Sequence, residues 1–174
     1  TEGRVGFNVV TSYLPSAAEN QGLPTQIPHD ERYDIADEFL DVCYKLWEGS
    51  WEDGAVIKDR ERGIYADPSK VHPIGHKGKY FSVPGISLTE PSPQRTPVIF
   101  QAGASSRGQQ FSGKHAEAVF ISALRPDLTR VVTDRIRAAA EEQGRSRDDV
   151  KILAMLSIIV DETEEKAKAK YEEY

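Results

Sequence analysis

The sequence predicts an α/β fold built on a parallel sheet. Short apolar, β-branched runs alternate along the chain with longer segments whose apolar residues recur at helical spacing. Four such strand–helix pairs follow one another without an internal repeat, and this alternation is typical of βαβ units. The 174 residues, 39% of them hydrophobic, suffice for a single domain with a buried core.

The first strand–helix pair is expected within residues 4–49. Residues 4–10, RVGFNVV, form a near-continuous apolar run, which favours a parallel strand buried on both faces. A loop rich in proline and glycine follows up to residue 28. A helix is then expected to begin at His29, to carry its apolar residues on one face and to end near Gly49.

Residues 50–96 form an irregular insert. Prolines and glycines are frequent, periodicity is weak, and only Tyr80–Val83 is expected to be a short strand. An irregular insert of this length between regular elements is usually functional or forms an interface.

Three further strand–helix pairs are expected after the insert. The strands are predicted at 97–101, 118–122 and 150–160, and the helices at 105–115, 127–143 and 162–174. The chain lacks an initiator Met and ends within a helical pattern, so we expect it to be a piece of a longer protein.

Composition excludes several classes of partner. The net charge of −6, with scattered Lys and Arg, argues against nucleic acid. No apolar run approaches the roughly 18 residues of a membrane span, and the polar first residues carry no secretory signal. The single cysteine, Cys43, cannot form an internal disulfide and is expected in the core. A cytoplasmic location is therefore expected.

The stretch PVIFQAGASSRGQQF, residues 97–111, is the clearest candidate for a binding site. An expected strand ends in a loop of small residues, and an expected helix follows. In parallel α/β folds ligands bind where strands end, and free N–H groups at a helix start attract anions such as phosphate. The alternative is a tight turn whose serines only cap the helix, and the pattern alone does not decide between the two.

Three stretches together resemble one family. They are residues 3–12 (GRVGFNVVTS), residues 29–53 (HDERYDIADEFLDVCYKLWEGSWED) and residues 65–120, which contain QAGASSRG. They are similar to the flavin-dependent, two-component monooxygenases of the bacterial-luciferase-like superfamily. The branch is the one that holds nitrilotriacetate, dibenzothiophene-sulfone and long-chain alkane monooxygenases.

The resemblance implies a fold and an activity. The family fold is a (β/α)8 TIM barrel, of which this chain would be a central segment of about four strand–helix units, one partial barrel domain over residues 1–174 with the insert at 50–96. The family uses reduced FMN as a cosubstrate, supplied by a separate NAD(P)H:FMN reductase, and O2 to oxygenate a small organic substrate. Open barrel edges also lead us to expect a homo-oligomer.

The resemblance assigns flavin-binding roles to several residues. Asn8 would lie under the flavin ring, unless it makes only a structural hydrogen bond inside the barrel. Thr11 would line the flavin or substrate pocket, unless it serves only the turn. Tyr33 would bind the FMN phosphate with His29 nearby on the same helical face, the alternatives being core packing for Tyr33 and a helix cap for His29. The phosphate loop would consist of Ala102, Gly103, Ala104, Ser105 and Ser106.

The sequence leaves other functions open. The rival function is a non-catalytic module that binds flavin or phosphate, and a third is an α/β enzyme acting on a sugar phosphate. His72 and His76 have a spacing seen in metal sites, but Pro73 and Gly75 between them argue against a shared helical face, so no metal is expected. No side chain stands out as a general acid or base.

Overall fold

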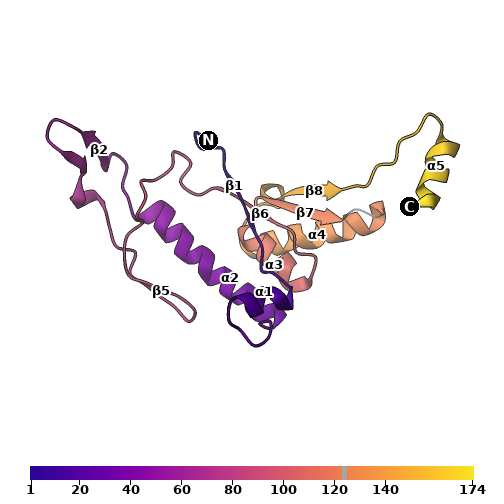
Figure 1. The fold of residues 1–174 in the computed structure, drawn as a ribbon, viewed down its shortest axis with the longest axis horizontal. Coiled ribbons are helices and arrows are strands. Elements are labelled where there is room, and N and C mark those ends of the chain that lie inside the picture. The colour runs from indigo at the N-terminus through magenta and orange to yellow at the C-terminus, as the bar shows by residue number, and fades with distance from the viewer. Residues whose placement is uncertain (123–124) are drawn as a thin grey trace.

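The computed structural model describes residues 1–122 and 125–174. Its centre is a four-stranded parallel sheet of β1 (Gly6–Val9), β6 (Val98–Gln101), β7 (Ala118–Ser122) and β8 (Lys151–Met155), in that spatial order. Each strand is followed in the chain by a helix: α2 (His29–Tyr44), α3 (Ser106–His115), α4 (Pro126–Glu142) and α5 (Glu164–Glu173). The predicted alternation of four strand–helix pairs is confirmed (Figure 1).

Helices α2, α3 and α4 cover one face of this sheet. Strand register pairs Val9 with Gln101 and Gln101 with Val119, so these side chains point to the same face. On that face Ile99 packs in one core cluster with residues of α2 and α3, and Val119 packs in a second with residues of α4. Helices on a single face are typical of a barrel wall, whereas a doubly wound sheet is covered on both.

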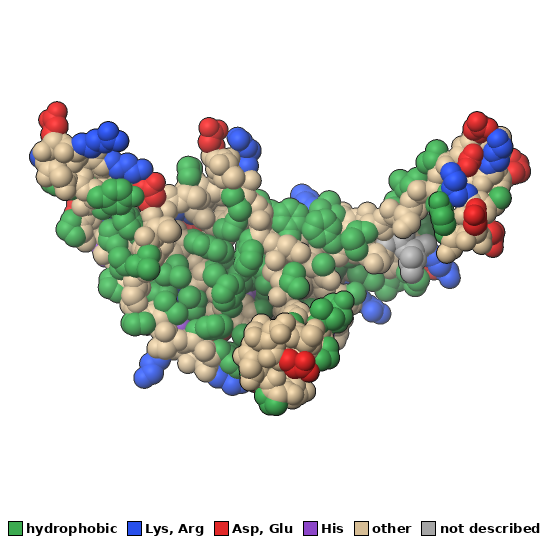
Figure 2. All heavy atoms as spheres, in the orientation of Figure 1, with side chains coloured by type: hydrophobic (Ala, Val, Ile, Leu, Met, Phe, Trp, Pro, Cys, Tyr) green, Lys and Arg blue, Asp and Glu red, His purple; other side chains and the backbone are tan. Residues whose placement is uncertain are grey.

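The opposite face of the sheet is open. Phe100 and Phe120 stack on it with ring centroids 5.6 Å apart, while Leu153 and Met155 are 39% and 53% exposed. Figure 2 shows apolar side chains across the middle of the molecule and the charged side chains of α5 gathered at one end. The α5 helix has no buried residue and stands apart from the sheet in Figure 1.

Strand β1 corrects one expectation. A strand buried on both faces was expected, but Val9 alone is buried and Gly6 and Asn8 are exposed. The reason is that Gly6 and Asn8 are in register with Val98 and Phe100 and lie on the open face of the sheet. The long predicted strand at 150–160 is also wrong in its second half, since β8 ends at Met155 and the next regular element is α5.

The first helix of the chain was not predicted from the sequence. The short helix α1 (Pro15–Asn20) lies within the predicted proline-rich loop. Helix α2 begins at His29 as expected, and a π-helical turn, Lys45–Gly49, carries it on to the expected end.

The insert at 50–96 contains two small antiparallel hairpins. One pairs β2 (Val56–Asp59) with β3 (Ile64–Ala66), and the other pairs β4 (His76–Lys77) with β5 (Ser82–Val83). The β2 hairpin projects from the body of the molecule in Figure 1, whereas the β4–β5 hairpin lies closer to α2. The short strand predicted at 80–83 is thus present over its last two residues.

Candidate functional site

The loops that follow β1 and β6 lie side by side at the carboxyl edge of the sheet. Because Val9 is in register with Gln101, the residues after each, Thr11 on one side and Gly103 on the other, emerge at the same edge. Helix α2 packs behind both strands and brings Tyr33 into a core cluster with Val9 and Ile99. The sequence-predicted residues of α2 and the 102–106 loop are therefore brought together.

The hydroxyl group of Tyr33 occupies a niche formed by two glycines. A Cβ atom on Gly103 would lie 2.6 Å from the Tyr33 hydroxyl oxygen, and one on Gly108 would lie 2.7 Å from it. Both separations are below any real Cβ contact, so only glycine fits at these two positions without displacing the phenol. The ring of Tyr33 is 4% exposed and packs against Phe111.

The hydroxyl proton of Tyr33 has no acceptor within residues 1–122 and 125–174. The one partner of this hydroxyl there is the amide nitrogen of Gln101 at 3.5 Å. An amide nitrogen can only donate, so the Tyr33 oxygen accepts and its own proton is left free. A buried hydroxyl proton without an acceptor in the protein suits an oxygen of a bound ligand as its partner.

The start of α3 presents unpaired backbone donors to the same place. Ser105 is the N-cap, and its hydroxyl accepts a hydrogen bond from the N–H of Gly108 at 3.1 Å. The capping alternative is thus observed for Ser105. In the described part of the chain the N–H groups of residues 104–107 have no acceptor, and Ser106 is exposed beside them. This arrangement suits an anion at the helix start.

Arg107 does not add free charge to this site. Its guanidinium donates to Asp34 and to Asp37 of α2 and lies over the Tyr33 ring at 5.7 Å from the centroid. Burial raises the pKa of Asp37, but hydrogen bonds from His115, Arg107 and Lys114 outweigh burial and hold that pKa below its ordinary value. The arginine therefore serves the contact between α2 and α3.

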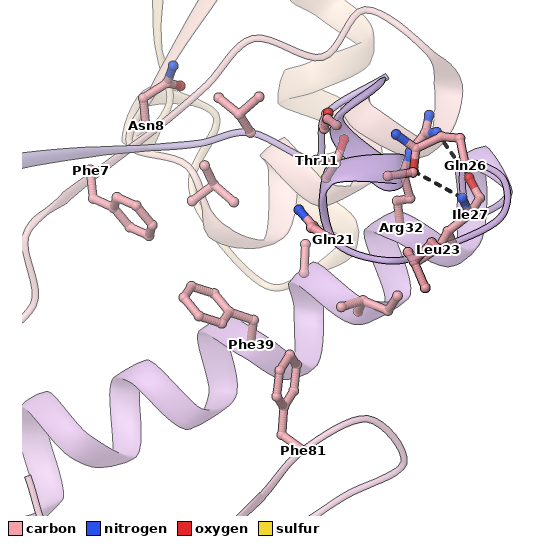
Figure 3. A pocket seen from close by; sticks show the side chains of 17 residues that line it. Phe7, Asn8, Thr11, Gln21, Leu23, Gln26, Ile27, Arg32, Phe39 and Phe81 are labelled. Carbon is pink, nitrogen blue, oxygen red and sulfur yellow. Dashed lines mark hydrogen bonds between the residues drawn. The ribbon is translucent and has the colours of Figure 1, made fainter. Parts of the chain in front are cut away.

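Asn8 and Thr11 line a separate cavity of about 450 Å³ along the free edge of β1. Figure 3 shows Asn8 and Phe7 pointing to opposite sides of the strand, with Phe39 and Phe81 near Phe7. The expected burial of the Asn8 amide is wrong in this chain, because the face on which it lies is open. Tyr33 and the 102–106 loop are not part of this cavity.

His29 lies beside Tyr33 as the four-residue spacing predicts, with ring centroids 5.2 Å apart. Its Nδ1 is 2.6 Å from Oδ1 of Asp30, and the residue is exposed. The capping alternative for His29 is wrong, since Pro28 is the N-cap of α2 and no side chain caps this helix.

Three polar side chains near the site were missed from the sequence. Gln101 and Gln109 are buried beside the 102–106 loop, and Arg32 lines the β1 cavity with its Nε buried and without a partner in the described residues. Figure 3 shows Arg32 lying beside Gln26. A glutamine that closes an apolar strand immediately before a glycine was the one signal available for Gln101.

The two histidines of the insert make separate contacts. His72 lies 2.7 Å from Glu52, whereas His76 is buried between Lys45 and Glu38. Within the described residues there is no group of three His, Cys, Asp or Glu side chains able to hold a metal ion. Within the same residues, no helix combines the length and apolarity needed to cross a membrane.

The whole chain matches a known family. Residues 1–174 fit the model described as luciferase-like monooxygenase. The chain belongs to the luciferase-like monooxygenase family. It is 56% identical over 174 residues to a dimethyl-sulfide monooxygenase from Hyphomicrobium sulfonivorans. The alignment covers 100% of this chain and 36% of that relative.

Solved structures of family members share the fold. A crystal structure of long-chain alkane monooxygenase superposes with a TM-score of 0.89 at 56% identity, over 97% of this chain and 39% of that one. A crystal structure of riboflavin lyase with a modified FMN and riboflavin gives a TM-score of 0.90 at 45% identity, over 98% of this chain and 38% of that one. The expected luciferase-like TIM-barrel class is confirmed, and the chain spans little more than a third of these relatives.

Proposed function

We propose that the full-length protein is a flavin-dependent monooxygenase that seats the phosphate of FMN at the start of α3. The observation that carries this proposal is the convergence of the free Tyr33 hydroxyl proton with the unpaired N–H groups of residues 104–107. Five donors that lack acceptors among the described residues, beside two glycines that leave room for the Tyr33 hydroxyl, match the several oxygens of a phosphate monoester.

The residues present fit FMN without further charge. Ala102, Gly103 and Ala104 carry almost no side chain, so the backbone can approach the phosphate closely, and Ser105 and Ser106 begin the helix beneath it. His29 flanks the phenol of Tyr33. Asn8, on the open face of β1, and Thr11, after its end, are the residues that we propose to contact the flavin ring.

When bound, reduced FMN supplies the electrons that allow O2 to oxygenate an organic substrate. This chain contributes binding, orientation and exclusion of water, and none of its side chains is assigned as a general acid or base. The proposal includes a separate NAD(P)H:FMN reductase as partner and a small organic substrate. It also includes a homo-oligomer of barrels, in each of which residues 1–174 belong to one domain with an insert at 50–96.

Flavin titration tests the phosphate site. The double variant Tyr33→Phe, Ser106→Ala removes two hydroxyl donors, and we expect its Kd for FMN to rise at least tenfold, because hydrogen bonds to a charged group contribute about 1.5–3 kcal/mol each. Tyr65→Phe, an exposed tyrosine in the insert, is the matched control and should leave the Kd unchanged. Equal FMN affinity in the double variant and the wild type would contradict the phosphate assignment.

Oxygen uptake separates an oxygenase from a module that only binds flavin. The full-length protein is mixed with FMN, NADH and a flavin reductase, and O2 consumption is followed with and without candidate organic substrates. We expect an oxygenated product whose yield depends on this protein. Tight FMN binding with no such product across sulfides, alkanes and amines would favour the non-catalytic alternative.

A further inference from the structure

The 102–106 loop is shaped by two buried glutamine side chains that lie outside it. Gln101, 3% exposed, accepts a hydrogen bond from the N–H of Gly103 through its Oε1. Gln109, 8% exposed, donates from its Nε2 to the carbonyl oxygen of Ala104 at 2.8 Å. Gln101, which precedes the loop, thus pairs with one loop donor, and Gln109, which follows the loop, pairs with one loop acceptor.

Gln101 also connects the loop to both helices of the site. Its Oε1 also lies 3.2 Å from the hydroxyl of Ser112 on α3, whose single proton is shared between this oxygen and the Gly108 carbonyl oxygen at 2.8 Å. Its Nε2 points to the Tyr33 hydroxyl on α2 at 3.5 Å. A single buried side chain therefore contacts the loop, the helix that follows it and the hydroxyl of Tyr33.

These hydrogen bonds pair one donor and one acceptor of the loop and leave the free N–H groups of the helix start unchanged. With the Gly103 N–H and the Ala104 carbonyl occupied, the N–H groups of residues 104–107 are the ones left without acceptors in the described residues. Because Gln101 donates to Tyr33, the phenol must direct its own proton elsewhere. With the Ala104 carbonyl paired, the groups of this loop that stay without a protein partner include the N–H groups of residues 104–107 and the Tyr33 proton, all of them donors.

Apolar residues would serve the core better if packing were the only requirement. Gln101 stands two residues after the buried Ile99, and Gln109 stands two residues before the buried Phe111. A buried amide costs free energy unless its donors and acceptor find hydrogen-bond partners. The loop itself has no long side chain to fix its conformation.

We propose that Gln101 and Gln109 are positioning residues that hold the 102–106 loop in the conformation that binds a phosphate monoester. This inference rests on the proposed FMN site. It predicts that loss of either amide weakens recognition of the phosphate group and leaves recognition of the flavin ring intact.

The test compares FMN with riboflavin, which lacks only the phosphate. Kd values for both are measured on the full-length protein by flavin fluorescence, with riboflavin read as a competitor of FMN so that both report on one site. In Gln101→Met and Gln109→Met we expect FMN affinity to fall about tenfold and riboflavin affinity to stay within twofold. Gln110→Met, an exposed glutamine on the same helix, is the matched control and should change neither.

Ser112→Ala provides a second, milder variant in case a methionine at residue 101 prevents folding. It removes the hydroxyl that contacts Gln101 and the Gly108 carbonyl oxygen and fits the same space, and we expect a smaller loss that is again confined to FMN. Equal losses for FMN and riboflavin would show a general structural role and overturn the inference. If the wild type itself binds both flavins equally, the proposed phosphate site fails instead; if it prefers FMN and the glutamine variants keep that preference, the positioning role alone is refuted.

Discussion

The guanidinium of Arg107 lies 2.5 Å from Oδ2 of Asp37 and joins the first turn of α3 to the middle of α2. Asp37 also accepts from His115 at 2.7 Å, near the other end of α3. One carboxylate therefore contacts both ends of this helix. Since the Arg107 charge is matched by Asp34 and Asp37 within the fold, the proposed phosphate at the helix start would be held by neutral donors.

Arg107→Gln is expected to destabilise the protein more than it weakens FMN binding. The side chain is 20% exposed and its loss leaves Asp37 less well paired, so we expect the free energy of unfolding to fall by about 1–3 kcal/mol. Urea titration measures this, and the Kd for FMN should change less than in the Tyr33 variant. Arg125→Gln removes an exposed pair with Asp127 and should cost under about 0.5 kcal/mol. A loss of FMN affinity with unchanged stability would instead make Arg107 a phosphate ligand.

Gly103→Ala tests the niche around the Tyr33 hydroxyl. The added methyl would meet that oxygen at 2.6 Å and the Gln101 amide at 2.8 Å, so the phenol and the loop must both move. We expect the Kd for FMN to rise about tenfold or more. Gly85→Ala is the control, because a Cβ there meets nothing within 4 Å and its backbone is not left-handed. Comparable affinity in both variants would show that the niche does not bind the flavin.

The alternation of strands and helices was predictable because it depends on local pattern. The apolar run that ends at Gln101 and the helix after Ser105 are both found within a residue of their predicted bounds. The start of α2 at His29 follows from acidic residues in its first turn and a regular apolar face. Tyr33 meets the glycine loop because parallel strands end at a common edge.

What escaped prediction depends on contacts between distant residues or on neighbouring strands. The hydrogen bonds of Gln101 reach across the chain to Tyr33 and along it to Ser112, and no spacing rule reveals them. Burial of Asn8 depends on what packs over the open face of the sheet, and local pattern does not reveal this. The helix α1 has proline at its first position and two alanines, a usable signal that the surrounding prolines obscured.

Cys43 is expected to be unreactive in the folded protein. Burial raises the pKa of its thiol to about 11, so almost no thiolate is present near neutral pH. A thiol reagent such as a disulfide dye at pH 8 should label it only after the chain is unfolded in denaturant. Rapid labelling of the native protein would show that the α2 helix opens readily or packs differently.

Acid stability should reveal the contact between Glu38 and the β4–β5 hairpin. The Glu38 carboxylate accepts from the backbone N–H groups of residues 79–81 and lies 3.2 Å from Nε2 of His76. Burial acts to raise its pKa, but these hydrogen bonds outweigh burial and lower the pKa from 4.5 to about 2. Because the folded-state pKa lies below that of the unfolded chain, the ionised carboxylate stabilises the fold above the unfolded value, and this stabilisation is lost as the pH falls from 4.5 toward 2.

Glu38→Gln isolates this contribution from that of other carboxylates. We expect the variant to be less stable than the wild type at pH 6, and the difference in the free energy of unfolding to shrink as the pH is lowered through this range. Urea titrations at pH 6, 4.5 and 3 measure the difference directly, and Glu61→Gln, in an exposed turn of the insert, provides the control. A difference that is the same at all three values would mean that the ionised form of Glu38 does not hold the hairpin. Because Phe81 follows this contact and packs against Phe39 with centroids 6.1 Å apart, loss of the carboxylate should also loosen one wall of the β1 cavity.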